Sequence, residues 1–148
     1  DKSDIKNQLS AMNPTGLTYI PAGLLWGWNL LDSNEPFVVE NSSKAVPKKV
    51  MLLMTDGANT MRPSAPHHVK SDDPSDADLR TDTLCENIKA AGITVYTVAF
   101  KVEEQSAINM LEKCASESAN AFDAKNKSAL IESFKVIARS VANVHVAK

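Results

Sequence analysis

The sequence predicts an α/β fold in which helices cover both faces of a doubly wound, mainly parallel sheet. Five apolar residues run without interruption over residues 50–54 and stop at Thr-Asp-Gly, which is the pattern of a short strand buried on both faces. A second strand pattern covers residues 93–100 and is separated from the first by a helical pattern. Strands separated by helices pair in parallel through right-handed crossovers, so these observations together define the fold class.

Composition suits one soluble globular domain over residues 1–148, with 43% hydrophobic and 23% charged residues. The net charge of −2 gives no attraction to nucleic acid. Apolar runs fall far short of the roughly 20 residues that cross a bilayer, so any membrane attachment is expected in segments outside this sequence. Because the chain begins at Asp1 and not at Met, we expect a processed or excised piece of a longer protein.

The first two expected elements are helices. Residues 3–12 carry Ile5, Leu9 and Met12 at helical spacing, with Ser3 or Asp4 available as the N-cap. After a turn at residues 13–16, Pro21 suits the first turn of a second helix. The apolar stripe expected on that helix comprises Leu24, Leu25, Trp28 and Leu31. For both tryptophans, Trp26 and Trp28, core packing is favoured over a binding role.

Two polar segments flank the strand at residues 50–54. Residues 32–49 predict a loop with a short extended piece at 37–39. Residues 58–83 contain three prolines and predict a long insertion loop, a feature that is often functional in a compact domain. The adjacent His67 and His68 lie inside it, where solvated side chains are favoured over metal ligands.

The second half alternates helices and strands. A helix marked by Leu84, Ile88 and Ala91 is expected to end at Gly92 in the C′ position. After the strand at 93–100, the pattern predicts a helix over 105–116 and a short edge strand over 120–124. The strongest helical pattern covers 128–143, and residues 144–146 form either a last strand or a tail.

Two stretches together resemble a known family. The first is Gly16-Leu17-Thr18, followed by a helix that opens with Pro21-Ala22-Gly23-Leu24, and the second is the apolar strand ending in Thr-Asp-Gly at residues 50–57. They are similar to the threonine loop and to the corresponding strand of the von Willebrand factor A domain, which has a Rossmann-like fold. More narrowly, the chain resembles the C-terminal region of TadG-like pilus-assembly proteins. The stretches that carry this closer resemblance are residues 18–28 (TYIPAGLLWGW), residues 54–60 (MTDGANT), residues 85–100 (CENIKAAGITVYTVAF) and Cys114-Ala115-Ser116.

The resemblance implies a metal-ion-dependent adhesion site (MIDAS), in which three loops hold Mg²⁺ or Mn²⁺ through hard oxygen ligands. Thr18, or alternatively Thr15, would supply the threonine, and Asp56 the aspartate. Thr55 would then only cap the turn.

The Asp-x-Ser-x-Ser motif of the third loop follows no strand in this sequence. Residues 1–5 match it in part but have no strand before them, and Asp73-Pro74-Ser75 lies in a polar segment. We therefore expect the first half of the domain, with its central first strand, to be missing. Because only two of the three metal-binding loops are present, we expect this chain to bind no metal or to bind it weakly. A complete metal site is then possible only in the full-length protein. The exposed strand edge predicts a dimer, a domain swap or pairing with a retained fragment.

Cys85 and Cys114 lie on helices that flank the strand at 93–100, so they form either one disulfide or two buried thiols. In the resembling proteins the soluble part lies outside the cytoplasmic membrane, where a disulfide persists. The resemblance therefore favours the bridge, and it implies a periplasmic or extracellular location with a membrane anchor in the full-length protein.

The resemblance implies a non-enzymatic module that binds a protein partner around Thr18 and Asp56, in Flp pilus assembly or adhesion. The alternative is a structural scaffold with a degenerate metal site. A hydrolytic enzyme is less favoured, because no Gly-x-Gly-x-x-Gly follows a strand and neither a phosphate loop nor a Gly-x-Ser-x-Gly elbow occurs. The three histidines fall in expected loops or the tail, which leaves such an enzyme without an evident base.

Overall fold

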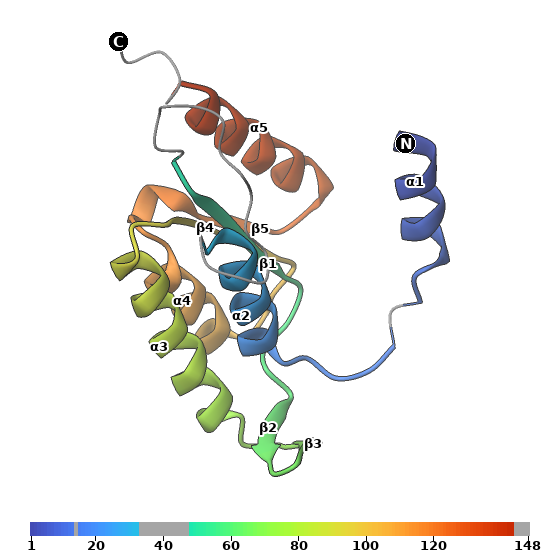
Figure 1. The fold of residues 1–148 in the computed structure, drawn as a ribbon, viewed down its shortest axis with the longest axis vertical. Coiled ribbons are helices and arrows are strands. Elements are labelled where there is room, and N and C mark those ends of the chain that lie inside the picture. The colour runs from blue at the N-terminus through green and yellow to red at the C-terminus, as the bar shows by residue number, and fades with distance from the viewer. Residues whose placement is uncertain (14, 33–47, 144–148) are drawn as a thin grey trace.

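The computed structural model describes residues 1–13, 15–32 and 48–143 of the chain. In these ranges the elements in chain order are α1 (Lys2–Ala11), α2 (Ile20–Leu31), β1 (Val50–Thr55), β2 (Met61–Ser64), β3 (His67–Lys70), α3 (Ser75–Ala90), β4 (Thr94–Phe100), α4 (Gln105–Cys114), the short 3-10 helix η1 (Ser118–Asn120), β5 (Ala121–Ala124) and α5 (Lys127–Asn143) (Figure 1). The expected extended piece at 37–39 and the expected strand or tail at 144–146 lie outside the described residues.

The main sheet has three parallel strands in the order β1-β4-β5, which confirms the predicted parallel α/β fold. Helices α2, α3 and α4 pack on one face, around a cluster that includes Leu24, Ile88 and Val95. Helix α5 packs on the other face through Ile137, against Tyr96 and Val98 of β4. The central strand β4 is therefore buried on both faces, as is typical of a central parallel strand covered by helices.

The prediction that β1 is buried on both faces is wrong. Met51 points into the core beneath α2, but Leu52 and Met54 on the opposite face keep 37% and 43% of their surface exposed. The reason is position: within the described residues β1 pairs only with β4, so it is an edge strand, and α5 packs over β4 and β5. An apolar run shows which side chains of a strand can be buried, but the packing of neighbouring elements determines which of them are actually buried.

The prediction of one long loop over residues 58–83 is also wrong. This segment contains the antiparallel hairpin β2-β3, with Met61 opposite Lys70 and a cis peptide between Ala65 and Pro66 at its turn, and then the first half of α3. The core-facing positions of α3 are Ala77, Thr81, Cys85 and Ile88. Alanine and threonine carry little hydrophobic signal, so the helical pattern becomes visible in the sequence only near Leu84.

The start and end of α3 have local causes. The carboxylate of Asp73 accepts a hydrogen bond from the Ser75 N–H at 3.1 Å, and the hydrogen bonds from Ser75 lower the pKa of Asp73 below its ordinary value. At the other end Gly92 has a φ of 77°, which glycine adopts without the steric cost of a Cβ. The predicted stop at Gly92 is confirmed.

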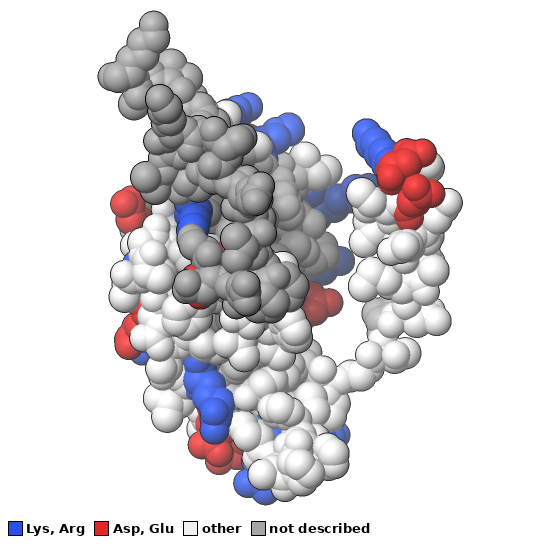
Figure 2. All heavy atoms as spheres, in the orientation of Figure 1, with Lys and Arg blue, Asp and Glu red and all other residues white. Residues whose placement is uncertain are grey.

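Helix α1 is confirmed, but its cap and its packing differ from expectation. Asp1, and not Ser3 or Asp4, caps the helix by accepting the Ser3 N–H at 3.0 Å. Ile5, Leu9 and Met12 are all exposed, and no residue of α1 is buried. Figures 1 and 2 show α1 standing apart from the rest of the molecule, largely uncharged beyond its first turn.

Helix α2 follows its predicted apolar stripe only in part. Leu24 is buried, and Trp28 and Leu31 pack against the core cluster, as predicted. Leu25 and Trp26 are instead exposed, so the expectation of core packing is wrong for Trp26. A 100° step per residue turns these two side chains away from the sheet and toward the side of the helix.

The remaining elements confirm the predicted helices and strand within one or two residues. The α4 face of Ala107, Met110, Leu111 and Cys114 is buried as predicted. In α5, Ile137 is buried and Val141 packs against the same cluster, but Phe134 on the predicted stripe stays exposed. None of the helices in the described ranges has the length and apolar character that a bilayer crossing requires.

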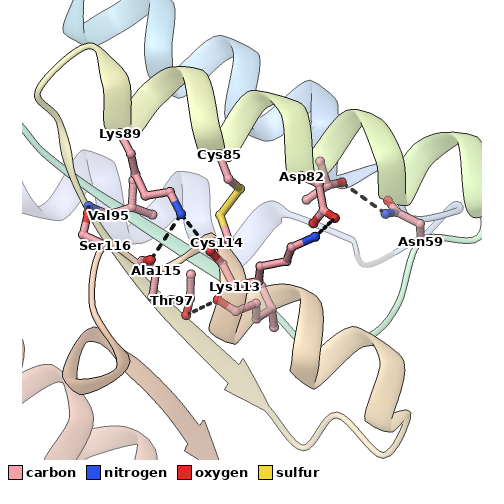
Figure 3. The surroundings of a disulfide bond; sticks show 12 residues. Asn59, Asp82, Cys85, Lys89, Val95, Thr97, Lys113, Cys114, Ala115 and Ser116 are labelled. Atoms are coloured by element: carbon pink, nitrogen blue, oxygen red, sulfur yellow. Dashed lines mark hydrogen bonds and ion pairs between the residues drawn. A yellow bond between two sulfur atoms is a disulfide. The ribbon is translucent and has the colours of Figure 1, made fainter.

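A disulfide between Cys85 and Cys114 joins α3 to α4 (Figure 3). Of the two alternatives left open by the sequence, the bridge is therefore the one observed. Polar contacts flank it on both sides. Lys113 Nζ contacts Asp82 at 2.7 Å, which raises the pKa of Lys113, and Lys89 Nζ donates to the Lys113 carbonyl at 2.8 Å.

The strand β4 is tied to the residues that follow α4. Ser116 accepts the Val95 N–H with its hydroxyl at 2.8 Å and donates its own N–H to the Val95 carbonyl at 3.0 Å. The Thr97 hydroxyl, buried beneath α4, donates to the Leu111 carbonyl at 2.9 Å. These contacts satisfy polar groups inside the α3-α4 layer, as buried polar groups require.

Candidate functional site

The carboxyl end of β1 presents the first candidate residue. The strand ends at Thr55, and the carboxylate of Asp56 lies beyond it on the surface. The Thr55 hydroxyl is occupied within the turn: it donates to the Gly57 carbonyl at 2.8 Å and accepts the Gly57 N–H at 3.3 Å. Thr55 therefore shapes the turn, whereas Asp56 forms no hydrogen bond or ion pair with any described residue.

The loop before α2 lies directly against the loop after β1. The Thr18 N–H donates to Thr60 Oγ1 at 2.8 Å, and the Thr60 N–H donates to the Thr18 carbonyl at 2.9 Å. This reciprocal pair joins residues that are 42 positions apart in the chain. The structure thus brings the Thr18 loop and the Asp56 loop to one end of the molecule.

The side chain of Thr18 is half-buried, and its hydroxyl makes no hydrogen bond to any described residue. The alternative threonine, Thr15, is exposed, and its N–H donates to the Asn13 carbonyl at 2.9 Å. The backbone contacts to the loop after β1 are made by Thr18 and Ile20. The structure therefore places Thr18, and not Thr15, against the loop that follows β1.

Asn59 is the residue of this region that sequence reasoning missed. It is only 3% exposed, and its Oδ1 accepts the Ile20 N–H at 2.7 Å. Its Nδ2 donates to Asp78 Oδ1 at 2.8 Å and to Thr81 Oγ1 at 3.4 Å. One amide therefore fastens the start of α2, the loop after β1 and the first half of α3 together.

A usable signal for this role existed in the sequence. Asn59 and Thr60 directly follow the Asp-Gly turn, and polar residues at such a position commonly bond backbone groups of neighbouring loops. The sequence predicts a long insertion loop over residues 58–83, however, and this prediction does not imply that Asn59 is buried. Its burial follows from α3 beginning at Ser75, which the hydrophobic pattern did not reveal.

The candidate side chains offer the type of ligand atom that a hard divalent cation binds, but they offer few such atoms. The Asp56 carboxylate and the Thr18 hydroxyl are oxygen ligands of the type that Mg²⁺ and Mn²⁺ prefer. Across residues 1–13, 15–32 and 48–143, no group of three or more acidic, histidine or cysteine side chains converges on a common point.

The fold and the paired loops define a class: a Rossmann-like α/β domain with hydroxyl and carboxylate side chains at the carboxyl edge of its parallel sheet. The chain belongs to the von Willebrand factor type A domain family, whose model matches residues 1–136. This match confirms the family resemblance seen in the sequence. Domains of this family are generally protein-interaction modules and not enzymes.

Solved structures agree with the fold. The pilus adhesin SpaC from Lactobacillus rhamnosus GG matches with a TM-score of 0.67 and 15% identity, covering 95% of this chain and 21% of SpaC. Proximal thread matrix protein 1 from the mussel byssus matches with a TM-score of 0.53 and 19% identity, covering 95% of this chain and 28% of that protein. The chain thus spans under a third of the length of these structures.

Another structure of the same mussel protein, with a zinc-occupied MIDAS motif, matches with a TM-score of 0.54 and 24% identity, covering 92% of this chain and 29% of that one. That protein therefore holds zinc at its own MIDAS motif. No curated protein matches the chain significantly. The narrower resemblance to TadG-like proteins receives no support from these comparisons and stays a prediction.

Proposed function

We propose that this chain is a non-enzymatic module for protein binding in adhesion or in pilus assembly of the Flp type at the cell envelope. One observation supports the proposal: hydrogen bonds between Thr18 and Thr60 hold the loop before α2 against the loop after β1, and on that second loop Asp56 is exposed and bonds to no described residue. The disulfide supports a periplasmic or extracellular location, because disulfides persist outside the reducing cytosol. The same proposal includes a membrane anchor in the full-length protein and a protein partner for the module.

The metal dependence of the module is part of the proposal. Thr18 and Asp56 would supply two of the ligand loops for Mg²⁺ or Mn²⁺, and an Asp-x-Ser-x-Ser loop outside the described residues would supply the third. The bound cation would offer an open position to an acidic group of the protein partner. The second candidate, a scaffold without a metal, is favoured by the lack of converging acidic ligands in the described ranges.

Calorimetric titration with Mg²⁺ and Mn²⁺ separates the two candidates. The 148-residue chain should give a flat or very weak isotherm, since two ligand loops do not hold a tight site. A longer chain that includes an Asp-x-Ser-x-Ser loop should bind saturably, and Asp56→Ala should abolish that binding. Asp72→Ala removes an exposed carboxylate elsewhere and should leave it unchanged. No saturable binding in the longer chain would establish the scaffold.

A second prediction concerns the free edge of β1. In the described part of the chain β1 pairs only with β4, so the backbone groups on its other side have no strand partner there. An unpaired hydrophobic edge favours pairing with another chain, so we expect a dimer or a domain-swapped dimer. Sedimentation equilibrium over a dilution series should give twice the chain mass at high concentration, whereas a monomer throughout would contradict the expectation.

A further inference from the structure

A groove of about 570 Å³ opens between α2, α3 and the hairpin strand β3. Its size falls within the range of about 300–1,000 Å³ that is typical of ligand sites. Three large apolar side chains line it and stay strongly exposed: Leu25 at 47%, Trp26 at 60% and Leu79 at 65%. Exposed apolar residues that gather in one concavity mark a binding surface more often than scattered ones do.

The wall of the groove on the hairpin side is aromatic and held in place. The rings of Tyr19 and His68 lie 4.2 Å apart between centroids and are tilted by 49°. Tyr19 stands between Thr18, which is bonded to Thr60, and Ile20, which is bonded to the buried Asn59. The aromatic wall is therefore preorganised, which reduces the entropy lost when a ligand binds.

The opposite wall, on α3, carries one charge of each sign. Asp76 and Arg80 are one helical turn apart, yet they form no ion pair with each other or with any other described residue. Asp76 has a structural reason to be there, since an acidic residue in the first turn stabilises the helix dipole. Arg80 lies in the middle of the helix, where the helix dipole gives it no such role, and it has no ion-pair partner among the described residues.

Figure 2 shows the molecule from the same side as Figure 1: uncharged surface covers much of the end that carries the hairpin, with charged side chains beside it. Apolar residues also predominate among the side chains that line the groove. The lining therefore suits a largely apolar ligand, and Arg80, which is unpaired among the described residues, suits an anion at one side of that ligand. Guanidinium groups pair with carboxylates through two parallel hydrogen bonds, which gives such a ligand a defined orientation.

We propose that this groove binds a peptide segment of a protein partner in which a bulky apolar side chain is followed directly by an acidic residue. The apolar side chain occupies the space between Trp26, Leu25 and Leu79, and the carboxylate pairs with Arg80. The surface lies beside the Thr18 loop but contains neither Thr18 nor Asp56. It extends the proposed protein-binding function with a second contact that needs no metal.

The test uses the ¹⁵N-labelled 148-residue chain and short acetylated, amidated peptides followed by NMR. Gly-Gly-Phe-Glu-Gly-Gly should shift the indole N–H signal of Trp26 saturably at millimolar concentration. Trp28 packs against the core outside the groove, so its indole signal should not move and serves as an internal reference. Gly-Gly-Phe-Lys-Gly-Gly should bind about fivefold more weakly, as expected for loss of one accessible ion pair.

Charge reversal at Arg80 tests the ion pair, and the same charge reversal at Arg139 serves as the control. Arg80→Glu should invert the preference, so that the lysine peptide binds better than the glutamate peptide. Arg139→Glu makes the same charge change on α5, away from the groove, and should leave the preference unchanged. Asp56→Ala should also leave it unchanged, which separates this inference from the metal proposal.

Three results would overturn the inference: no saturable shift of Trp26 with either peptide, equal binding of both peptides to the unaltered chain, or an unchanged preference in Arg80→Glu. An added titration with N-acetylglucosamine tests the other ligand class that aromatic walls favour. Saturable binding of the sugar at Trp26 without binding of the peptides would assign the groove to saccharides and refute the peptide proposal.

Discussion

Removing the Cys85–Cys114 disulfide is expected to lower the free energy of unfolding by about 3 to 4 kcal/mol. The bridge closes a loop with a sequence separation of 29, and opening that loop returns conformational entropy to the unfolded chain. Both cysteines are almost fully buried in the cluster that joins α3 and α4 to the sheet. Alanine is the appropriate replacement, because serine would bury an additional hydroxyl in an apolar site.

Urea unfolding followed by circular dichroism measures this effect in the Cys85→Ala, Cys114→Ala double variant. The matched control is the unaltered chain in a reducing agent, which keeps both side chains and loses only the covalent bond. The difference between the reduced chain and the double variant then reports the loss of packing alone. An unchanged unfolding midpoint in reductant, with reduction verified by thiol titration, would show that the bridge does not contribute as expected.

The second large effect is expected at Asn59. Replacement by alanine leaves the buried Ile20 N–H without its acceptor and removes the donors to Asp78 and Thr81. An unsatisfied buried donor costs about 1 to 3 kcal/mol, so the free energy of unfolding should fall by about 2 to 3 kcal/mol. The same change should loosen the start of α2 and with it the Thr18 loop.

Urea unfolding gives the stability, and amide hydrogen exchange gives the local effect. The Ile20 amide should exchange faster in Asn59→Ala, beyond what the global loss of stability explains. Asn87→Ala is the control: this asparagine is exposed on α3, and alanine is at least as favourable in a helix. Equal stability of the two variants would contradict the role assigned to Asn59.

Asn59→Asp sharpens the same prediction. The substitution keeps the shape of the side chain and its acceptor for the Ile20 N–H, but it places a second carboxylate where the amide nitrogen contacts Asp78 Oδ1 at 2.8 Å. Two carboxylates in contact raise the pKa of one of them. The variant should therefore be least stable at neutral pH and should recover relative to the unaltered chain as the pH falls and one carboxyl takes a proton.

The parts predicted correctly from sequence are those whose signals are local. The strand pattern of β4, the buried face of α4 and the glycine at position 92 depend on residues close together in the chain. The loops that carry Thr18 and Asp56 were located by motif resemblance, and the structure places these loops against each other. Whether the two side chains bind metal stays a prediction.

The errors share one cause. The covering of β1 depends on where α5 lies, the burial of Asn59 depends on α3 starting early, and the exposure of Trp26 depends on the space between α2 and α3. Each of these facts concerns two elements that are distant in the chain. Hydrophobic periodicity is a property of one segment, so it carries no information on them.

By itself the sequence determined the class of fold, the order of the main helices and strands, and the family to which the chain belongs. Only the tertiary structure decided which face of β1 is covered. It also showed that the polar segment at 58–83 forms a hairpin and the first half of a helix, and that an aromatic groove opens beside the Thr18 loop. A segment's own residues fix which surface it can bury, whereas the elements packed around it fix which surface is actually removed from water.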